Sequence, residues 1–185
     1  SAIGADWWST HEPNQINVRA AFASPSLEHF LGTDQLGRDI FSRVLVGGQI
    51  ALKVSLISIG VALLIGLTLG LIAGFGPRWV DNILMLLFDS VRSFPTVMFA
   101  LAVVTLFGPS LTTIMIIVIV TQIPIYGRMV RSQTLALKNS EFILTERAIG
   151  AGFFRIIFVH MLPNVIGPLL ILASMDIPFV ITIEA

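Results

Sequence analysis

The sequence predicts an all-α, polytopic transmembrane helical bundle. Of its 185 residues, 55% are hydrophobic and only 12% are charged, whereas charged residues make up about a quarter of a typical soluble domain. No charged residue lies between Lys53 and Arg78, and none lies between Arg92 and Arg128. Because a span needs about 20 apolar residues, the first gap fits one span. The second gap is longer, and a Gly-Pro pair at 108–109 divides it between two spans.

The formal net charge is zero and the chain has no cysteine. A globally basic surface that would bind nucleic acid is therefore not expected, and disulfides, thiolate catalysis and cysteine metal sites are excluded. The three histidines, His11, His29 and His160, have no second ligand at metal-binding spacing. No Ser/His/Asp set or carboxylate pair indicates catalysis. We therefore expect no metal, no cofactor and no enzymatic activity.

Turn residues and apolar runs predict the order of the elements. Residues 1–35 are polar and rich in turn residues, which is typical of an extramembrane loop. Residues 36–48 have an apolar face and a charged face, which predicts an amphipathic helix at the membrane interface. Four spans follow, at about 50–74, at 82–107 with an interruption at Pro95, at 111–129, and from Pro163 to the end. The chain looks like a fragment that lacks a span at each end.

Lysine and arginine in the loops predict the orientation of these spans. The stretch from Arg128 to His160 is rich in both residues, and the turn at Pro77 adds Arg78. Two spans separate these loops, so both are expected in the cytoplasm. Residues 1–48 would then form an extracytoplasmic segment with its interfacial helix, and residues 49–185 a transmembrane domain with a cytoplasmic loop at about 131–162.

This cytoplasmic loop contains the signals of a short helix over 141–149. Ser140 is a suitable N-cap, Glu141 suits the positive end of a helix, and Gly150 is a natural stop. A second helical stretch leads from Phe153 into the last span. The loop could be an ordinary connection between helices, or a docking surface in which apolar residues are ringed by charge.

Three stretches of the sequence carry a family resemblance. They are LGTDQLGRD at 31–39, WVD at 79–81 followed by Met85, Asp89 and Phe94-Pro95, and Gly150 followed after nine residues by HMLPN at 160–164. The third stretch is similar to the EAA…G…I-LP loop of binding-protein-dependent ABC importer permeases. The other two resemble the dipeptide/oligopeptide/nickel subfamily. The resemblance runs from about residue 25 to residue 185.

The resemblance implies a type I ABC-importer permease fold in the bacterial inner (plasma) membrane. It implies two ATPase subunits, a second permease subunit and an extracytoplasmic substrate-binding protein as partners, with lipid around the spans. Peptides or a related small solute would then cross by alternating access, and a separate chain would hydrolyse ATP.

The resemblance also assigns coupling with the ATPase to the predicted cytoplasmic helix. The family's EAA letters fall on Leu144, Thr145 and Glu146, so a leucine replaces the glutamate and a glutamate replaces the second alanine. Glu141 and Gly150 keep the family's residues. The expected coupling residues are Glu141, Phe142, Ile143, Leu144, Thr145, Glu146, Arg147, Ala148, Ile149 and Gly150.

A few charged residues lie within or beside the expected spans. Arg92 follows Asp89 by three residues, which favours a structural ion pair over a proton relay. Asp176 lies inside the last span, where a charge is costly, so we expect it to face the substrate pathway or a subunit interface. Asp89, Arg92 and Asp176 are therefore candidate pathway or interface residues.

Two further motifs favour a structural role. Gly66, Gly70 and Gly74 form a GxxxGxxxG stripe, which permits close helix packing. The sequence GTDQLGRD favours tight turns with locally paired charges, and it lacks the ending of a phosphate-binding loop.

Two rival functions remain on the sequence alone. An ion-coupled secondary transporter would use Asp89 or Asp176 and should contain inverted repeats, which are not evident. A structural membrane subunit would need no long cytoplasmic loop with a helix–stop–helix pattern.

Overall fold

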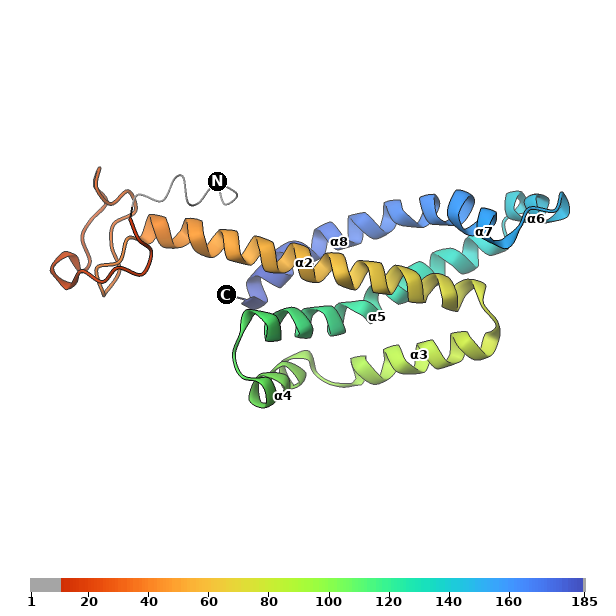
Figure 1. Ribbon diagram of the computed structural model, residues 1–185, viewed down its shortest axis with the longest axis horizontal. Helices are drawn as coiled ribbons and strands as arrows, with labels where there is room; N and C mark the ends of the chain where they lie inside the picture. The colour runs from red at the N-terminus through yellow and green to blue at the C-terminus, as the bar shows by residue number, and fades with distance from the viewer. Residues whose placement is uncertain (1–10, 185) are drawn as a thin grey trace. The chain divides into compact units, whose positions relative to one another are not determined.

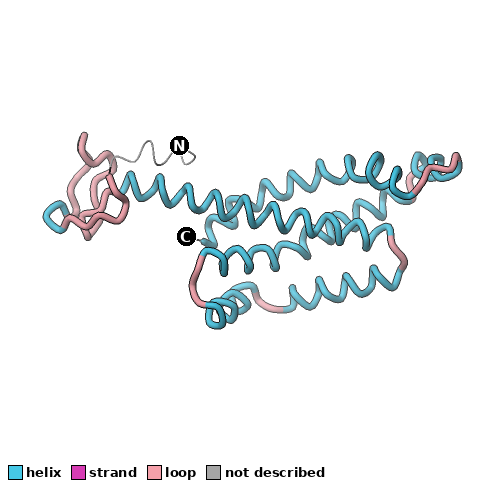
Figure 2. The backbone as a smooth tube through the Cα atoms, viewed as in Figure 1, coloured by secondary structure: helices cyan, strands magenta, loops and turns pink. Residues whose placement is uncertain are grey.

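The computed structural model describes residues 11–184 as two compact units, residues 11–54 and 55–184. Apart from a single bridge between Thr33 and Asp39, the regular elements of these residues are helices (Figures 1 and 2). The first unit holds a 3-10 turn, η2 (Val18–Ala20), and the start of α2 (Ile40–Phe75). Residues 1–10 of the predicted extracytoplasmic segment lie outside the described residues.

The second unit contains the remaining elements. They are α3 (Arg78–Ser93), α4 (Thr96–Phe107), α5 (Leu111–Lys138), α6 (Glu141–Ala148), α7 (Phe153–Arg155), a π-helical segment η3 (Ile156–Met161) and α8 (Leu162–Glu184). Three helical stretches are long and apolar enough to cross a membrane, namely Ile40–Phe75, Leu111–Lys138 and Phe153–Thr182. A fourth crossing results if the bent pair α3–α4 counts as one span.

The turn-rich segment before α2 is held together by its own side chains. Asp34 accepts backbone hydrogen bonds from Leu36 at 2.8 Å and Arg38 at 3.0 Å, and it forms an ion pair with the Arg38 side chain at 2.7 Å. Burial alone would raise the pKa of Asp34, but these hydrogen bonds outweigh it and hold that pKa below its ordinary value. The prediction of tight turns with locally paired charges is confirmed.

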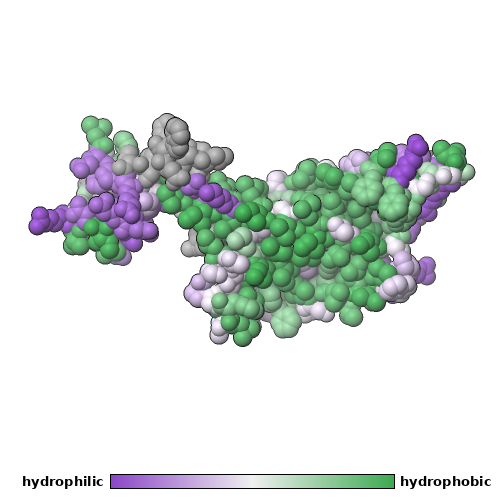
Figure 3. Space-filling view, viewed as in Figure 1, coloured by the Kyte–Doolittle hydropathy of each residue, from purple (hydrophilic) through white to green (hydrophobic). Residues whose placement is uncertain are grey.

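Helix α5 is the centre of the second unit, because α3, α4 and α8 all pack against it. The buried core combines Tyr126 and Val130 of α5 with Ile59 and Ala62 of α2 and Leu169 of α8. The face seen in Figure 3 is a nearly continuous apolar surface over this unit. In water such a surface would be costly, whereas it suits a helix bundle whose solvent is lipid.

The glycine stripe of α2 packs directly on α5. A Cβ atom at Gly66, Gly70 or Gly74 would come within 2.7 Å of side-chain or backbone atoms of α5. Without side chains at these three positions the two backbones approach closely. The prediction that the stripe serves helix packing is confirmed.

The structure corrects three expected boundaries. The expected interfacial helix at 36–48 is not a separate element, because residues from Ile40 onward belong to the same helix as the first span. The third span continues as helix to Lys138, ten residues beyond Arg128. The second span breaks into α3 and α4, which meet at an angle of 83°. Phe94 and Pro95 have extended backbone there, and proline disfavours helical geometry in the preceding residue.

Candidate functional site

Helix α6 begins at Glu141, as the sequence predicts. Ser140 takes the N-cap position with extended backbone, and its carbonyl accepts the amide hydrogen of Leu144 at 3.1 Å. The Ser140 hydroxyl does not cap α6. Instead it donates to the Leu137 carbonyl at 2.6 Å, which ties the turn to the last residues of α5.

The other end of α6 is closed by a glycine turn. Gly150 has a φ of +86° and its amide donates to the Arg147 carbonyl at 3.0 Å. The Ala151 amide donates to the Glu146 carbonyl at 2.9 Å. This pair of bonds is the Schellman motif, which requires a left-handed residue after the helix and therefore favours glycine. The expected stop at Gly150 is confirmed.

Ile143 is the buried residue of α6. Ile143 is fully buried and packs with Ile156 and Met161 of η3. Three neighbouring apolar side chains, Phe142, Leu144 and Ile149, have 44%, 51% and 74% of their surface exposed. Ile143 therefore packs α6 against η3, whereas Phe142, Leu144 and Ile149 remain exposed.

Two cations contact the end of α2, one from α5 and one from α6. Lys138 donates to the Phe75 carbonyl at 3.2 Å, where a cation complements the negative end of α2. The Arg147 guanidinium lies over the Phe75 ring, 5.0 Å from its centroid, within the range of a cation–π interaction. The Arg147 contact therefore ties α6 to the end of α2, and the Lys138 contact ties α5 to the same end.

Glu146 stands at the position where the family resemblance expects alanine, and its carboxylate faces a histidine. Its Oε2 lies 3.6 Å from Nε2 of His160 in η3. Both atoms are buried, and neither has a hydrogen-bond partner within residues 11–184. The facing atoms of this acid and base are therefore held just beyond hydrogen-bonding distance.

Two ion pairs join α3 to α5. The Arg131 guanidinium donates a hydrogen bond to each carboxylate oxygen of Asp81, and the bond to Oδ2 is 2.6 Å long. Arg128 binds Asp89 at 2.7 Å. The expected Asp89–Arg92 pair is wrong, because Asp89 pairs with a residue 39 positions away on α5. The spacing rule for one helix cannot identify a partner on another helix.

Asp176 also has a partner on α5. The hydroxyl of Tyr126 donates to its Oδ2 at 2.8 Å, and Tyr126 itself is fully buried. Tyr126 lies in an apolar run of the sequence, and its position there gives no signal of this contact. The hydrogen bond offsets part of the cost of a carboxyl group in a span. That Asp176 faces the substrate pathway or a subunit interface stays a prediction.

A pocket lies beside the break between α3 and α4. It is lined by Arg92, Phe94, Thr96, Gln122 and other residues of α4, α5 and α8. Gln122 is 95% buried, and its Nε2 has no hydrogen-bond partner in the described part of the chain. The pocket thus combines a cation with a buried amide donor in an otherwise apolar wall.

Comparison with known proteins identifies the architecture that holds these features. Residues 66–185 match the family described as the binding-protein-dependent transport system inner membrane component. The chain belongs to this family. The match covers α3 to α8 and the last ten residues of α2, and it includes α6 and the pocket. It confirms the resemblance, the type I permease fold and the inner-membrane location that the sequence predicts.

Two relatives illustrate the family. A dipeptide transport system permease protein of Alkalihalophilus pseudofirmus is 42% identical over 174 residues, which are 94% of this chain and 57% of the relative. A glutathione transport system permease protein of Pectobacterium atrosepticum is 40% identical over 153 residues, 83% of this chain and 51% of the relative. The chain thus spans between half and three fifths of the length of these two relatives. Both are named as transport permeases rather than enzymes.

The Asp81–Arg131 pair is expected to stabilise this family member measurably. We expect Arg131→Gln to lower the free energy of unfolding by about 1.5–3 kcal/mol, because Asp81 then loses a charged hydrogen-bond donor. The side chains of the pair are only 16% and 29% exposed. Unfolding of the purified protein in detergent, in a double-mutant cycle with Asp81→Asn, measures the coupling.

The second ion pair is the matched control for this cycle. The side chains of Asp89 and Arg128 are 65% and 39% exposed, so their pair is expected to contribute no more than about 1 kcal/mol. Equal coupling energies in the two cycles would contradict the distinction.

Proposed function

We propose that this chain is the membrane-spanning permease subunit of an ATP-driven ABC importer for peptides or a related small solute. The proposal rests on the exposed apolar side chains of the α6 segment. Ile143 is buried there, whereas Phe142, Leu144 and Ile149 are exposed. A few apolar anchors ringed by charge are what a docking surface needs. The names of the two relatives support peptides as the substrate class.

In this proposal α6 is the coupling helix. It lies between α5 and the α7–η3–α8 stretch, both of which belong to candidate spans. A partner ATPase that moves α6 would therefore move two spans through one short rigid element. The Lys138 and Arg147 contacts with the end of α2 would carry the same motion to a third span. The spans would rock so that the cavity opens alternately to each side of the membrane.

The pocket beside the α3–α4 break is the proposed place where the solute passes. Broken helices in transporters expose backbone groups to substrates near the middle of the membrane. A peptide carries a carboxylate and amide groups, which Arg92 and the Gln122 amide can bind. Few polar groups line this wall, so we propose that selectivity resides mainly in the extracytoplasmic binding protein.

The proposed partners follow from the same assignment. Two ATPase subunits would dock on the cytoplasmic loops, and a second permease subunit would complete the pathway. An extracytoplasmic substrate-binding protein would deliver the solute. This chain would supply the pathway and the coupling contact.

Co-purification with the ATPase tests the docking role. We expect Ile149→Asp to weaken ATPase association by about tenfold, because an interface anchor of this kind is worth about 1–2 kcal/mol. Leu27→Asp is the matched control, since Leu27 is 94% exposed and lies in the other unit. If the Ile149→Asp variant associates with the ATPase as strongly as the unchanged protein does, the proposed docking role is wrong. Uptake that follows a proton gradient without the ATPase would support the ion-coupled alternative.

A further inference from the structure

Two of the three histidines of the chain come together in the segment before α2. The rings of His11 and His29 have their centroids 4.8 Å apart, although 17 residues separate them in the sequence. Together with Glu28 they offer three metal-ligand atoms that all lie within 4.8 Å of one another. The three residues line one pocket of this segment. Spacing along the sequence predicted no second ligand near any histidine, because ligands from distant turns leave no spacing signal.

A buried carboxylate orients one of these imidazoles. Oδ1 of Asp39 lies 3.1 Å from Nδ1 of His29, and Asp39 is only 3% exposed. The other carboxylate oxygen accepts the Ser42 amide at 2.8 Å, which fixes the carboxylate at the first turn of α2. An ionised carboxylate can only accept, so Nδ1 donates the hydrogen of this bond, and in the neutral imidazole Nε2 then has the lone pair that a metal ion needs. Metal-binding histidines commonly have such a carboxylate on their second nitrogen.

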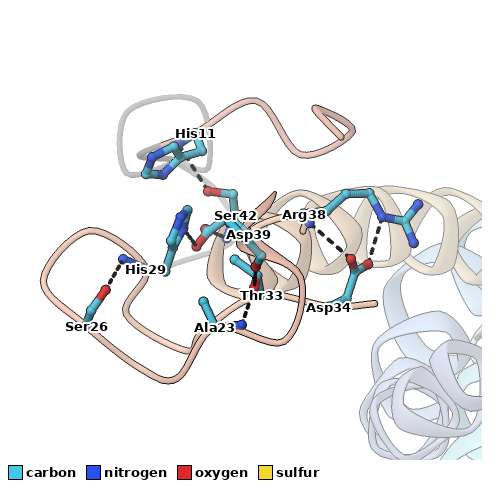
Figure 4. Close-up of polar contacts among 10 residues, drawn as sticks. His11, Ala23, Ser26, His29, Thr33, Asp34, Arg38, Asp39 and Ser42 are labelled. Carbon is cyan, nitrogen blue, oxygen red and sulfur yellow. Dashed lines mark hydrogen bonds and ion pairs between the residues drawn. The ribbon is translucent and has the colours of Figure 1, made fainter. Parts of the chain in front are cut away.

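The same turn of α2 also positions the backbone at His11. The His11 amide donates to Oγ of the buried Ser42 at 3.2 Å, and the His29 amide donates to Oγ of Ser26 at 3.0 Å. Figure 4 shows His11, His29, Asp39 and Ser42 gathered at the start of α2. The two histidines are therefore positioned by neighbouring groups of one helical turn, while the third ligand, Glu28, is exposed at the surface.

We propose that His11, Glu28 and His29 bind one divalent transition-metal ion of the Zn²⁺ type. Two imidazoles and one carboxylate suit borderline ions such as Zn²⁺ better than Mg²⁺ or Ca²⁺, which prefer oxygen ligands alone. Ligand atoms on a tetrahedral Zn²⁺ lie about 3.3 Å apart, so the set must contract, and the exposed side chain of Glu28 is free to swing inward. A bound ion would cross-link His11 to the turn at residues 28–29.

Zinc titration of the purified full-length protein in detergent tests this site. The protein is purified through a tag without histidine, stripped of metal, and titrated with ZnCl₂ against a fluorescent zinc indicator. We expect about one Zn²⁺ per chain at this site, and a loss of affinity of about 10- to 100-fold in His11→Gln, in His29→Ala and in the orienting variant Asp39→Asn. Asparagine at 39 keeps an oxygen for the Ser42 amide, so this variant retains the helix cap.

His160→Ala is the matched control, because His160 is the third histidine and the chain has no cysteine. Its zinc affinity should equal that of the unchanged protein. The proposal is overturned if the unchanged protein binds no zinc, or if zinc affinity is unaffected in both His11→Gln and His29→Ala. It is equally overturned if His160→Ala weakens binding as much as they do. A zinc-dependent rise in the thermal unfolding temperature that disappears in His11→Gln would support it independently.

Discussion

Gly70→Leu is expected to destabilise the folded protein by about 3 kcal/mol, the upper end of the range for an overpacked core. A Cβ atom at Gly70 would lie 2.6 Å from the backbone carbonyl oxygen of Gly127 and equally close to Val130. A backbone atom cannot move aside as a side-chain end can, so α2 and α5 must separate. Detergent-solubilised yield and the unfolding temperature measure the effect.

Gly60→Leu is the control within the same helix. Nothing lies within 4 Å of a Cβ atom at Gly60, so the same substitution meets open space there. Glycine in a helix interior costs roughly 0.5–1 kcal/mol relative to alanine, and the control should therefore be neutral or slightly stabilising. If the two variants unfold at the same temperature, close packing of the glycine stripe does not contribute to stability.

Gly150→Arg is expected to reduce transport by more than about tenfold, since a loss of 1.4 kcal/mol in docking corresponds to that factor. The left-handed conformation costs an ordinary L-residue about 1–2 kcal/mol, so arginine would loosen the turn that ends α6. It would also place a new charge beside the exposed Ile149. Substrate uptake and ATPase association are measured together, with membrane insertion checked by the amount of protein in the membrane fraction.

Two variants separate backbone strain from charge at this turn. Gly150→Asn changes the side chain but tolerates the left-handed conformation, so it should retain most of the transport. Gly152→Arg introduces the same charge two residues later, where φ is an ordinary −66° and the space around the Cβ position is open. Equal loss of transport in Gly152→Arg and Gly150→Arg would show that charge alone matters, and full transport in Gly150→Arg would contradict its coupling role.

The sequence predicted those features that depend on neighbouring residues. Ser140, Glu141 and Gly150 place both ends of α6 within a residue, because caps and stops act over a single turn. The glycine stripe predicted close packing, although not that α5 would be the partner. In the same way Pro95 predicted an interruption but not an angle of 83°.

Contacts between residues far apart in the sequence could not be predicted from the sequence. Asp89 finds its partner on α5 rather than on its own helix, and Tyr126 reaches Asp176 across 50 positions. The His11–His29 cluster depends on how the loop folds back to the start of α2. The predicted end of the interfacial helix at residue 48 failed for a different reason, since the helix continues through Gly47 and Gly48 into the span.

The break between α3 and α4 has a consequence for hydration. Residues 92–97 are exposed in the isolated chain, and Pro95 has no amide hydrogen. Helices α3 and α4, with 16 and 12 residues, are only about 24 Å and 18 Å long, so neither half can cross the hydrocarbon core of about 30 Å alone. Carbonyl groups freed at the bend would be left without donors in lipid, which costs several kcal/mol for each. Where the pair crosses the membrane, the bend must therefore face water or another protein surface rather than lipid.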